Sequence, residues 1–186
     1  VADFETGDRV LISCIPSCGK CAHCRRGLYS HCAQGGWILR NTIDGTQAEY
    51  VRIPFADTSL YPIPDEAADE PLVMLSDIFP TGYECGVLKG RVSPGDVVAI
   101  VGAGPIGLAT LLTAQFYTPA EIIMIDPDES RLRTAQELGA TRLIAAAGQS
   151  AVDRVLEFSG GRGVDVAIEA VGVPSAFEVC QSINAP

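Results

Sequence analysis

The sequence is poor in aromatic and basic residues. Aromatic residues make up 6% of the chain, and 13 Lys and Arg residues stand against 23 Asp and Glu residues, which gives a formal net charge of −10. Such an acidic chain repels the phosphates of nucleic acids and of anionic membranes, so we expect neither as a partner. Hydrophobic residues make up 47% of the chain, which is enough to build a globular core.

Two further features are missing from the sequence. The opening Val-Ala-Asp-Phe-Glu has no basic start followed by an apolar segment, so no secretory signal is evident. With seven cysteines, this favours a reducing, cytoplasmic location in which the thiols bind metal or stay reduced. The charge-free stretch 97–120 contains three glycines and a proline near its middle. It therefore predicts a buried strand, a turn and a helix rather than a membrane span.

Four of the cysteines follow the spacing C-x2-C-x2-C-x7-C within a predicted zinc lobe, residues 14–35. They are Cys18, Cys21, Cys24 and Cys32. Four thiolates satisfy the tetrahedral preference of Zn²⁺ and leave no open position, which is typical of a structural site rather than a catalytic one. The alternative is a disulfide pair or uncoordinated thiols.

The pattern of apolar residues changes near residue 76. Residues 1–76 read as short β segments and turns, with strands expected at 9–14 and 45–53. Strands then alternate with helices over 77–186, which predicts an α/β domain with a parallel sheet. The expected strands are 97–101, 122–125, 142–145 and 164–169, and the expected helices are 106–116, 129–138 and 152–158. Gly139 is placed to end the second of these helices.

A G-x-G-x-x-G motif follows the first buried strand and opens a helix. Its residues include Gly102, Gly104, Pro105, Ile106 and Gly107. The first glycine permits a tight turn, the second lets a pyrophosphate approach the backbone, and the third allows close packing of the helix. The free N–H groups at the start of the helix favour phosphate. The alternative is a structural turn that binds nothing.

Asp126 ends the second buried strand. An acid there can accept hydrogen bonds from the adenosine ribose hydroxyls and repel a 2′-phosphate, which indicates NAD rather than NADP. The alternative is an ordinary turn acid ahead of Pro127. Arg131, one turn into the next helix, is a candidate for contacting the ribose or a phosphate, or is a solvated surface arginine.

This combination of motifs resembles the zinc-dependent medium-chain alcohol dehydrogenases, in the bacterial type with an aspartate ligand to the catalytic zinc. The resemblance extends to 4–10, 76–83 and 163–169. It implies a partial GroES-like domain, residues 1–76, followed by a truncated Rossmann domain, residues 77–186. It also implies zinc and NAD as cofactors, a small alcohol or aldehyde as substrate, and a homodimer or homotetramer.

The resemblance assigns roles to three more residues. Asp77 stands where the family places the third ligand of the catalytic zinc, and Thr81 where it places a threonine near the nicotinamide. Trp37 matches a tryptophan that lines the substrate pocket of secondary-alcohol members. From the residues alone, Asp77 could equally cap the following helix, and Trp37 could be a core or subunit-contact aromatic.

The sequence also departs from the family. The family's catalytic cysteine and Gly-His-Glu segment should lie upstream, and the only histidines, His23 and His31, lie within the cysteine lobe and cannot replace them. The predicted sheet stops after its fourth strand, which we expect to leave an unpaired edge. We therefore expect an internal part of a longer subunit, inactive when isolated.

These observations predict that the parent protein oxidises an alcohol to an aldehyde or ketone by zinc-dependent hydride transfer to NAD. The alternatives within the family are a polyol, threonine or formaldehyde dehydrogenase. From other classes, the chain could be a non-catalytic remnant that binds NAD and zinc. A zinc-knuckle interaction module fused to a Rossmann regulator is disfavoured by the acidic charge.

Overall fold

The structure is a computed structural model that describes residues 1–185. The chain divides into two compact units, of which unit 1 is Val1–Asp77 and unit 2 begins at Ile78. No helix among the described residues is both long and apolar enough to cross a bilayer.

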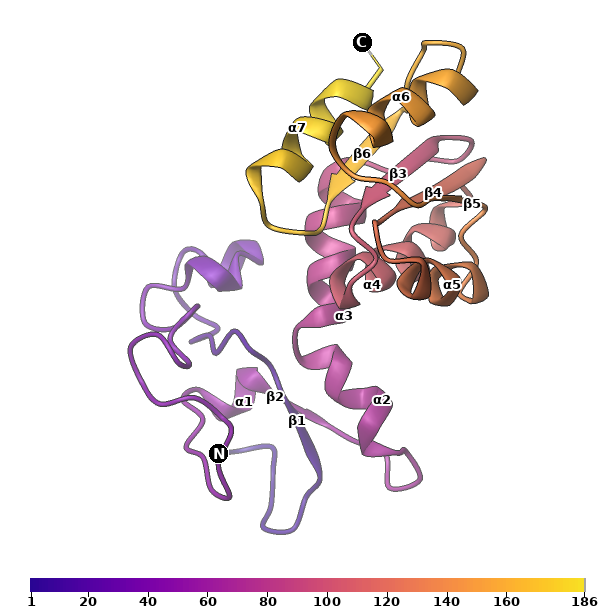
Figure 1. Cartoon of the computed structure of the whole chain (residues 1–186). Helices are drawn as coiled ribbons and strands as arrows, with labels where there is room; N and C mark the ends of the chain where they lie inside the picture. The colour runs from indigo at the N-terminus through magenta and orange to yellow at the C-terminus, as the bar shows by residue number, and fades with distance from the viewer. Residues whose placement is uncertain (186) are drawn as a thin grey trace. The chain divides into compact units, whose positions relative to one another are not determined.

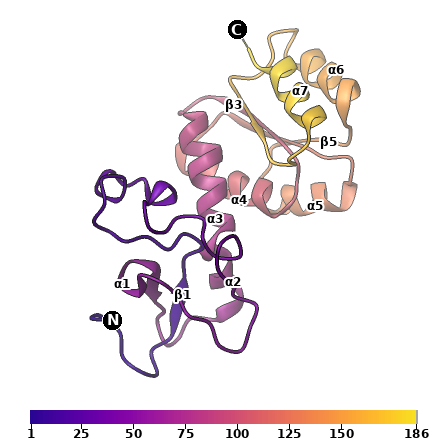
Figure 2. The ribbon, with the colours of Figure 1, turned by 90° about the vertical axis from the view of Figure 1, so that its left-hand side faces the viewer.

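Unit 1 contains little regular structure, and most of it is loop (Figure 2). Its elements are β1 (Val10–Ile12), the 3-10 helices η1 (Cys24–Arg26) and η2 (Tyr29–His31), α1 (Ala56–Ser59), β2 (Leu60–Pro62), α2 (Asp69–Val73) and η3 (Met74–Ser76). Strands β1 and β2 pair antiparallel. The Arg9 guanidinium donates hydrogen bonds to the carbonyl oxygens of Pro64, Asp65 and Ala67 and forms an ion pair with Asp69. These contacts fix the loop between β2 and α2.

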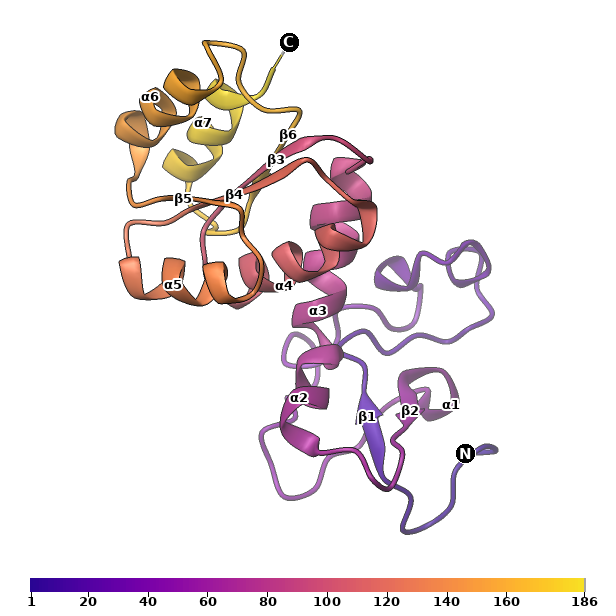
Figure 3. The same cartoon turned by 90° about the vertical axis from the view of Figure 1, so that its right-hand side faces the viewer.

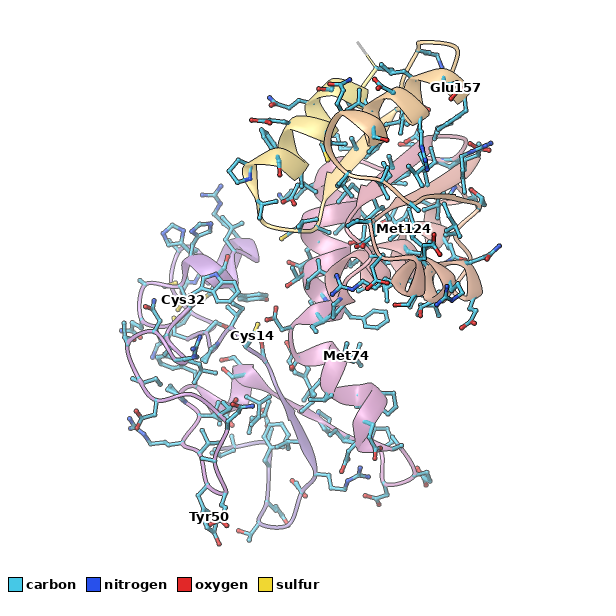
Figure 4. All side chains as sticks on the ribbon, viewed as in Figure 1. Cys14, Cys32, Tyr50, Met74, Met124 and Glu157 are labelled. Atoms are coloured by element: carbon cyan, nitrogen blue, oxygen red, sulfur yellow. The ribbon has the colours of Figure 1, made fainter. Side chains whose placement is uncertain are left out.

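The strand predicted at 45–53 is wrong, because this segment is irregular in the structure. A strand needs a hydrogen-bonded neighbour, and the only sheet of unit 1 among the described residues consists of β1 and β2. Tyr50, which would lie near the middle of the strand, is 92% exposed at the tip of a loop (Figure 4).

Unit 2 is built on a four-stranded parallel sheet with the strand order β5-β4-β3-β6. Its strands are β3 (Val97–Val101), β4 (Glu121–Ile125), β5 (Arg142–Ile144) and β6 (Val166–Glu169). Its helices are α3 (Ile78–Thr81), the π-helix η4 (Gly82–Leu88), α4 (Pro105–Ala114), the 3-10 helix η5 (Gln115–Tyr117), α5 (Glu129–Glu137), α6 (Gly148–Phe158) and α7 (Pro174–Ile183). The four predicted strands and three predicted helices are confirmed to within a few residues.

The sheet separates two hydrophobic cores because its central strands are apolar on both faces. Val98 and Ile100 of β3 pack on the side of η4, α4 and α5, whereas Ala99 and Val101 pack on the side of α6 and α7. Figures 1 and 3 show these helices on opposite faces of the sheet. As predicted, Gly139 follows α5 with a φ of +106°, a left-handed value that ends a helix without Cβ strain.

The prediction that the sheet leaves an unpaired edge at its fourth strand is wrong in part. Asn184 forms a parallel bridge with Val164, just before β6. The Val164 N–H donates to the Ile183 carbonyl at 2.8 Å, and the Ala185 N–H donates to the Val164 carbonyl at 2.8 Å. The segment after α7 therefore returns to the sheet beside β6.

Candidate functional sites

The four predicted zinc ligands converge within the loops of unit 1. The Sγ atoms of Cys18, Cys21, Cys24 and Cys32 all lie within 4.8 Å of one another. Cys24 Sγ is 3.5 Å from Cys21 Sγ and 3.9 Å from Cys18 Sγ. A regular tetrahedron with Zn–S distances of about 2.3 Å has S–S edges of about 3.8 Å. A disulfide would bring two sulfurs to about 2.05 Å. The cluster therefore has the dimensions of a four-thiolate zinc site.

The chain around these cysteines supports metal binding. Cys24 and Cys32 are buried, and Cys32 is labelled in Figure 4. The Cys18 N–H lies 3.3 Å from the sulfur of Cys32, a contact that orients and stabilises a thiolate. The lobe also carries the exposed cations Lys20, Arg25 and Arg26, and no acidic residue occurs between Asp8 and Asp44. This local positive charge offsets the net charge of −2 that four thiolates and one Zn²⁺ would carry.

The thiols of the cluster do not ionise alike. Hydrogen bonds from the backbone N–H groups of Ala33 and Cys24 lower the pKa of the Cys21 thiol to about 6. Burial raises the pKa of the Cys24 thiol to about 12. Cys24 therefore keeps its proton at neutral pH until a metal ion displaces it, so zinc binding must release protons.

The glycine-rich loop connects β3 to α4 at the carboxyl edge of the sheet. Gly102 has a φ of +105°, and a Cβ on it would meet Val171 Cγ2 at 2.7 Å. A Cβ on Gly107 would lie 1.8 Å from the Gly102 carbonyl oxygen, whereas a Cβ on Gly104 would meet nothing within 4 Å. The first and third glycines therefore allow close packing, and the second leaves its backbone open to a ligand.

Helix α4 begins directly after this loop, with Pro105 as its first residue and no side-chain cap. Pro105 has no N–H to leave unsatisfied, and Ile106 follows it with partial exposure. The uncapped N–H groups of the first turn carry partial positive charge, as in sites that bind phosphate. These features fit the diphosphate of a dinucleotide.

Asp126 follows β4 and is 5% exposed. Its Oδ2 accepts a hydrogen bond from the Ala103 N–H at 2.8 Å, and its Oδ1 accepts one from the Asp128 N–H at 2.8 Å. The structure thus brings Asp126 and the glycine-rich loop together, as the sequence predicts. Arg131 is exposed and lies 3.9 Å from Asp126 and 3.8 Å from Asp128.

Two further acidic residues lie at this edge of the sheet, and the sequence patterns predicted no role for them. Asp128 caps α5, because its Oδ1 accepts a hydrogen bond from the Ser130 N–H at 2.7 Å. Its position one residue before a helical run signals such a cap. Glu169 ends β6, and its Oε1 accepts hydrogen bonds from the N–H groups of Val171 and Gly172 at 2.7 and 2.8 Å. Because the carboxyl ends of parallel strands share one edge of a sheet, the position of Glu169 at the end of a predicted strand would have indicated that it lies at this edge.

Thr81 is half buried at the junction of α3 and η4 in unit 2. Its neighbour Gly82 packs on α4 so tightly that a Cβ would lie 2.8 Å from the Thr110 backbone nitrogen. The buried Thr110 hydroxyl donates to the Ile106 carbonyl at 2.9 Å. Thr81 therefore adjoins a close contact between η4 and the middle of α4.

Asp77 and Trp37 line one open cavity of about 1460 Å³ within unit 1. Asp77 directly follows η3 and is half buried, and Trp37 is 57% exposed. Asp44 lines the same cavity. His23 and His31 are exposed near the cysteine cluster, with ring centroids 6.2 Å apart.

Comparisons with known proteins agree with this arrangement. The family model described as an alcohol dehydrogenase GroES-like domain matches residues 1–65, and the model described as a zinc-binding dehydrogenase matches residues 105–186. An alcohol dehydrogenase of Cupriavidus necator is 41% identical over 152 residues, which cover 82% of this chain and 41% of the relative. A medium chain reductase/dehydrogenase of an Acremonium species is 35% identical and covers 100% of this chain and 66% of that relative.

A solved structure, a zinc dependent alcohol dehydrogenase from Streptococcus pneumoniae, is 54% identical with a TM-score of 0.92. The match covers 100% of this chain and 52% of that one. The chain thus spans between about two fifths and two thirds of the length of these relatives. The two matched domains and these relatives, together with the cysteine cluster and the glycine-rich loop, show that the chain belongs to the zinc-dependent medium-chain alcohol dehydrogenase family.

Proposed function

We propose that the protein containing this chain oxidises an alcohol to an aldehyde or ketone with NAD as the hydride acceptor. The observation that carries the proposal is the carboxyl edge of the unit 2 sheet. There the open face of Gly104, the uncapped start of α4 and the carboxylate of Asp126 lie on adjoining loops. This set of groups suits a diphosphate joined to an adenosine ribose.

The preference for NAD over NADP rests on charge. Asp126 and Asp128 place two carboxylates in the turn that follows β4, and Arg131 is the one cation paired with them among the described residues. A 2′-phosphate on the ribose would add about two negative charges to this acidic turn. Coulomb repulsion at 4 Å is about 4 kcal/mol per charge pair at an effective dielectric constant of 20. Replacing Asp126 with serine should therefore narrow the ratio of NAD to NADP affinity.

The catalytic roles are proposals drawn from the family. Asp77 would supply one oxygen ligand to a catalytic zinc, with the remaining ligands coming from outside residues 1–186. Trp37 would line the pocket for the alcohol, and Thr81 would lie beside the nicotinamide. When bound, zinc polarises the alcohol oxygen and lowers its pKa, and NAD accepts the hydride. The four-cysteine cluster would only hold its lobe, because its coordination shell is closed.

The test uses the complete protein and compares two carboxylates of one cavity. Asp77→Ala should lower alcohol-dependent NAD reduction by more than the 10–100-fold that the loss of a group supporting a metal ligand costs. It should also remove zinc beyond that held by the cysteines. Asp44→Ala is the matched control, because Asp44 lines the same cavity, and it should keep the activity and the zinc content. Equal effects of the two variants would contradict the role of Asp77.

The substrate, the oligomeric state and the cellular location are also proposals. We expect a small alcohol or aldehyde as the substrate, a homodimer or homotetramer, and a cytoplasmic location. Sedimentation of the complete protein would decide the oligomeric state.

A further inference from the structure

The carboxylate of Asp126 accepts hydrogen bonds from two backbone N–H groups. One is the N–H of Ala103, the residue between the first two glycines of the loop, and the other is the N–H of Asp128, at the start of α5. Both hydrogen bonds measure 2.8 Å, and each uses a different carboxylate oxygen. Asp126 therefore links two loops that are 23 residues apart in the sequence.

The geometry has two consequences for a bound nucleotide. A carboxylate offers about four lone-pair sites, so each oxygen of Asp126 keeps one for a ribose hydroxyl. The N–H of Ala103 is already directed at Asp126 and is not available to a phosphate. The N–H groups available to the phosphate are thus those from Gly104 onward, through the first turn of α4.

We propose that Asp126 is a positioning residue for the phosphate-binding loop, in addition to any contact that it makes with the ribose. It holds Ala103, and with it the turn at Gly102, in the conformation that leaves Gly104 open. This inference rests on the proposed function, because the loop is taken to bind the diphosphate of NAD.

Loop positioning and simple ribose recognition predict opposite changes in the affinity for a ligand that lacks ribose hydroxyls. A ligand without ribose hydroxyls gives Asp126 nothing to recognise, so removing the carboxylate should leave its affinity unchanged or raise it, since one repulsive charge is lost. If Asp126 holds the loop, the same change weakens binding. In Asp126→Asn the amide oxygen can accept from one N–H, but the amide NH₂ group is turned toward the other N–H. One of the two N–H groups, that of the buried Ala103 or that of Asp128, is then left without its acceptor, and the link between the two loops is broken.

The experiment measures the binding of 2′,3′-dideoxyadenosine 5′-diphosphate by calorimetry to the wild-type chain, Asp126→Asn and Asp128→Asn. Asp128→Asn is the matched control, because it removes one charge from the same turn and asparagine also caps helices well. We expect at least tenfold weaker binding for Asp126→Asn, and unchanged or tighter binding for Asp128→Asn. Unchanged or tighter binding in Asp126→Asn would overturn the proposal.

A second measurement on the ligand-free wild-type chain keeps the test decisive if Asp126→Asn does not fold. The Ala103 amide should exchange its hydrogen at least tenfold more slowly than an unstructured amide, because it is buried and hydrogen-bonded. Exchange at the unprotected rate would overturn the proposal. If the wild-type chain does not bind the diphosphate although its Ala103 amide is protected, the proposed nucleotide function fails and the positioning role of Asp126 stands.

Discussion

Alanine substitutions at two glycines of one loop should separate protein stability from cofactor binding. Gly107→Ala should destabilise the fold, whereas Gly104→Ala should spare the fold and weaken NAD binding. In Gly107→Ala the new methyl group would lie 1.8 Å from the Gly102 carbonyl oxygen. Non-bonded heavy atoms prefer about 3.5 Å. The obstacle is backbone, so no side-chain rotation relieves it, and α4 must move away from the loop. We expect the upper end of the cost of overpacking, about 3 kcal/mol, out of a total stability of about 5–15 kcal/mol.

Gly104→Ala should spare the fold. A Cβ there meets nothing within 4 Å, and the φ of −78° suits alanine. The expected loss is below about 1 kcal/mol, the usual cost of alanine at a helix N-cap. The methyl group would project toward the proposed position of the diphosphate. NAD should therefore bind at least tenfold more weakly, which corresponds to about 1.4 kcal/mol.

Urea unfolding followed by far-ultraviolet circular dichroism measures the first effect, and calorimetric titration with NAD measures the second. With a denaturant slope of about 2 kcal/mol/M, Gly107→Ala should lower the urea midpoint by about 1.5 M, and Gly104→Ala by less than about 0.5 M. Wild-type NAD affinity in Gly104→Ala would refute the position assigned to the diphosphate. Wild-type stability in Gly107→Ala would refute the packing of α4 on the loop.

Three further predictions concern the metal, the helix cap and catalysis. Purified protein should hold one zinc per chain in the cysteine cluster, and Cys24→Ser should lose it, whereas Cys85→Ser, at an exposed cysteine outside the cluster, should keep it by metal analysis. Asp128→Ala should lower the free energy of unfolding at neutral pH, because α5 loses its N-terminal cap. Hydrogen bonds from the Ser130 hydroxyl and from the N–H groups of Ser130 and Arg131 lower the pKa of Asp128 in the folded state. The advantage of wild type over Asp128→Ala should therefore be full above the unfolded pKa of about 3.9 and disappear as the pH falls through the folded pKa. Finally, residues 1–186 alone should show no alcohol-dependent NAD reduction, since Asp77 is a single proposed ligand, and zinc-dependent turnover by this chain would mean that the active site is elsewhere.

The central strands of unit 2 could be predicted because their burial leaves a local signature. Val97–Val101 and Glu121–Ile125 are continuous apolar runs rich in β-branched residues, which is typical of strands covered on both faces. The segment 45–53 also alternates like a strand, but its pairing depends on a neighbour that residues 1–185 do not provide. Local pattern alone cannot supply that information.

Because proline and glycine lower helix propensity, the sequence gives no bounds for the helices at 69–88, although it allows a helix after Asp77. Pro71 and Pro80 both lie in the first turn of a short helix, α2 and α3, where the missing N–H costs no hydrogen bond. Gly82 and Gly86 lie within η4, and a Cβ on either would come within 3.0 Å of Thr110. Close packing of η4 on α4 therefore outweighs the weak propensity of its glycines.

The two cofactor sites differ in how much of their geometry is local in the sequence. The zinc ligands lie within one loop region, so their spacing alone predicts that their sulfurs can converge. Gly102, Asp126 and Glu169 come from the ends of three strands, and only the order β4-β3-β6 brings them to one edge. Their meeting follows from the parallel topology, but the hydrogen bond from Ala103 to Asp126 does not. That contact depends on the turn at Gly102 and on the burial of a carboxylate. An acid that the sequence identifies as a ribose ligand can therefore also hold the loop that binds the phosphate.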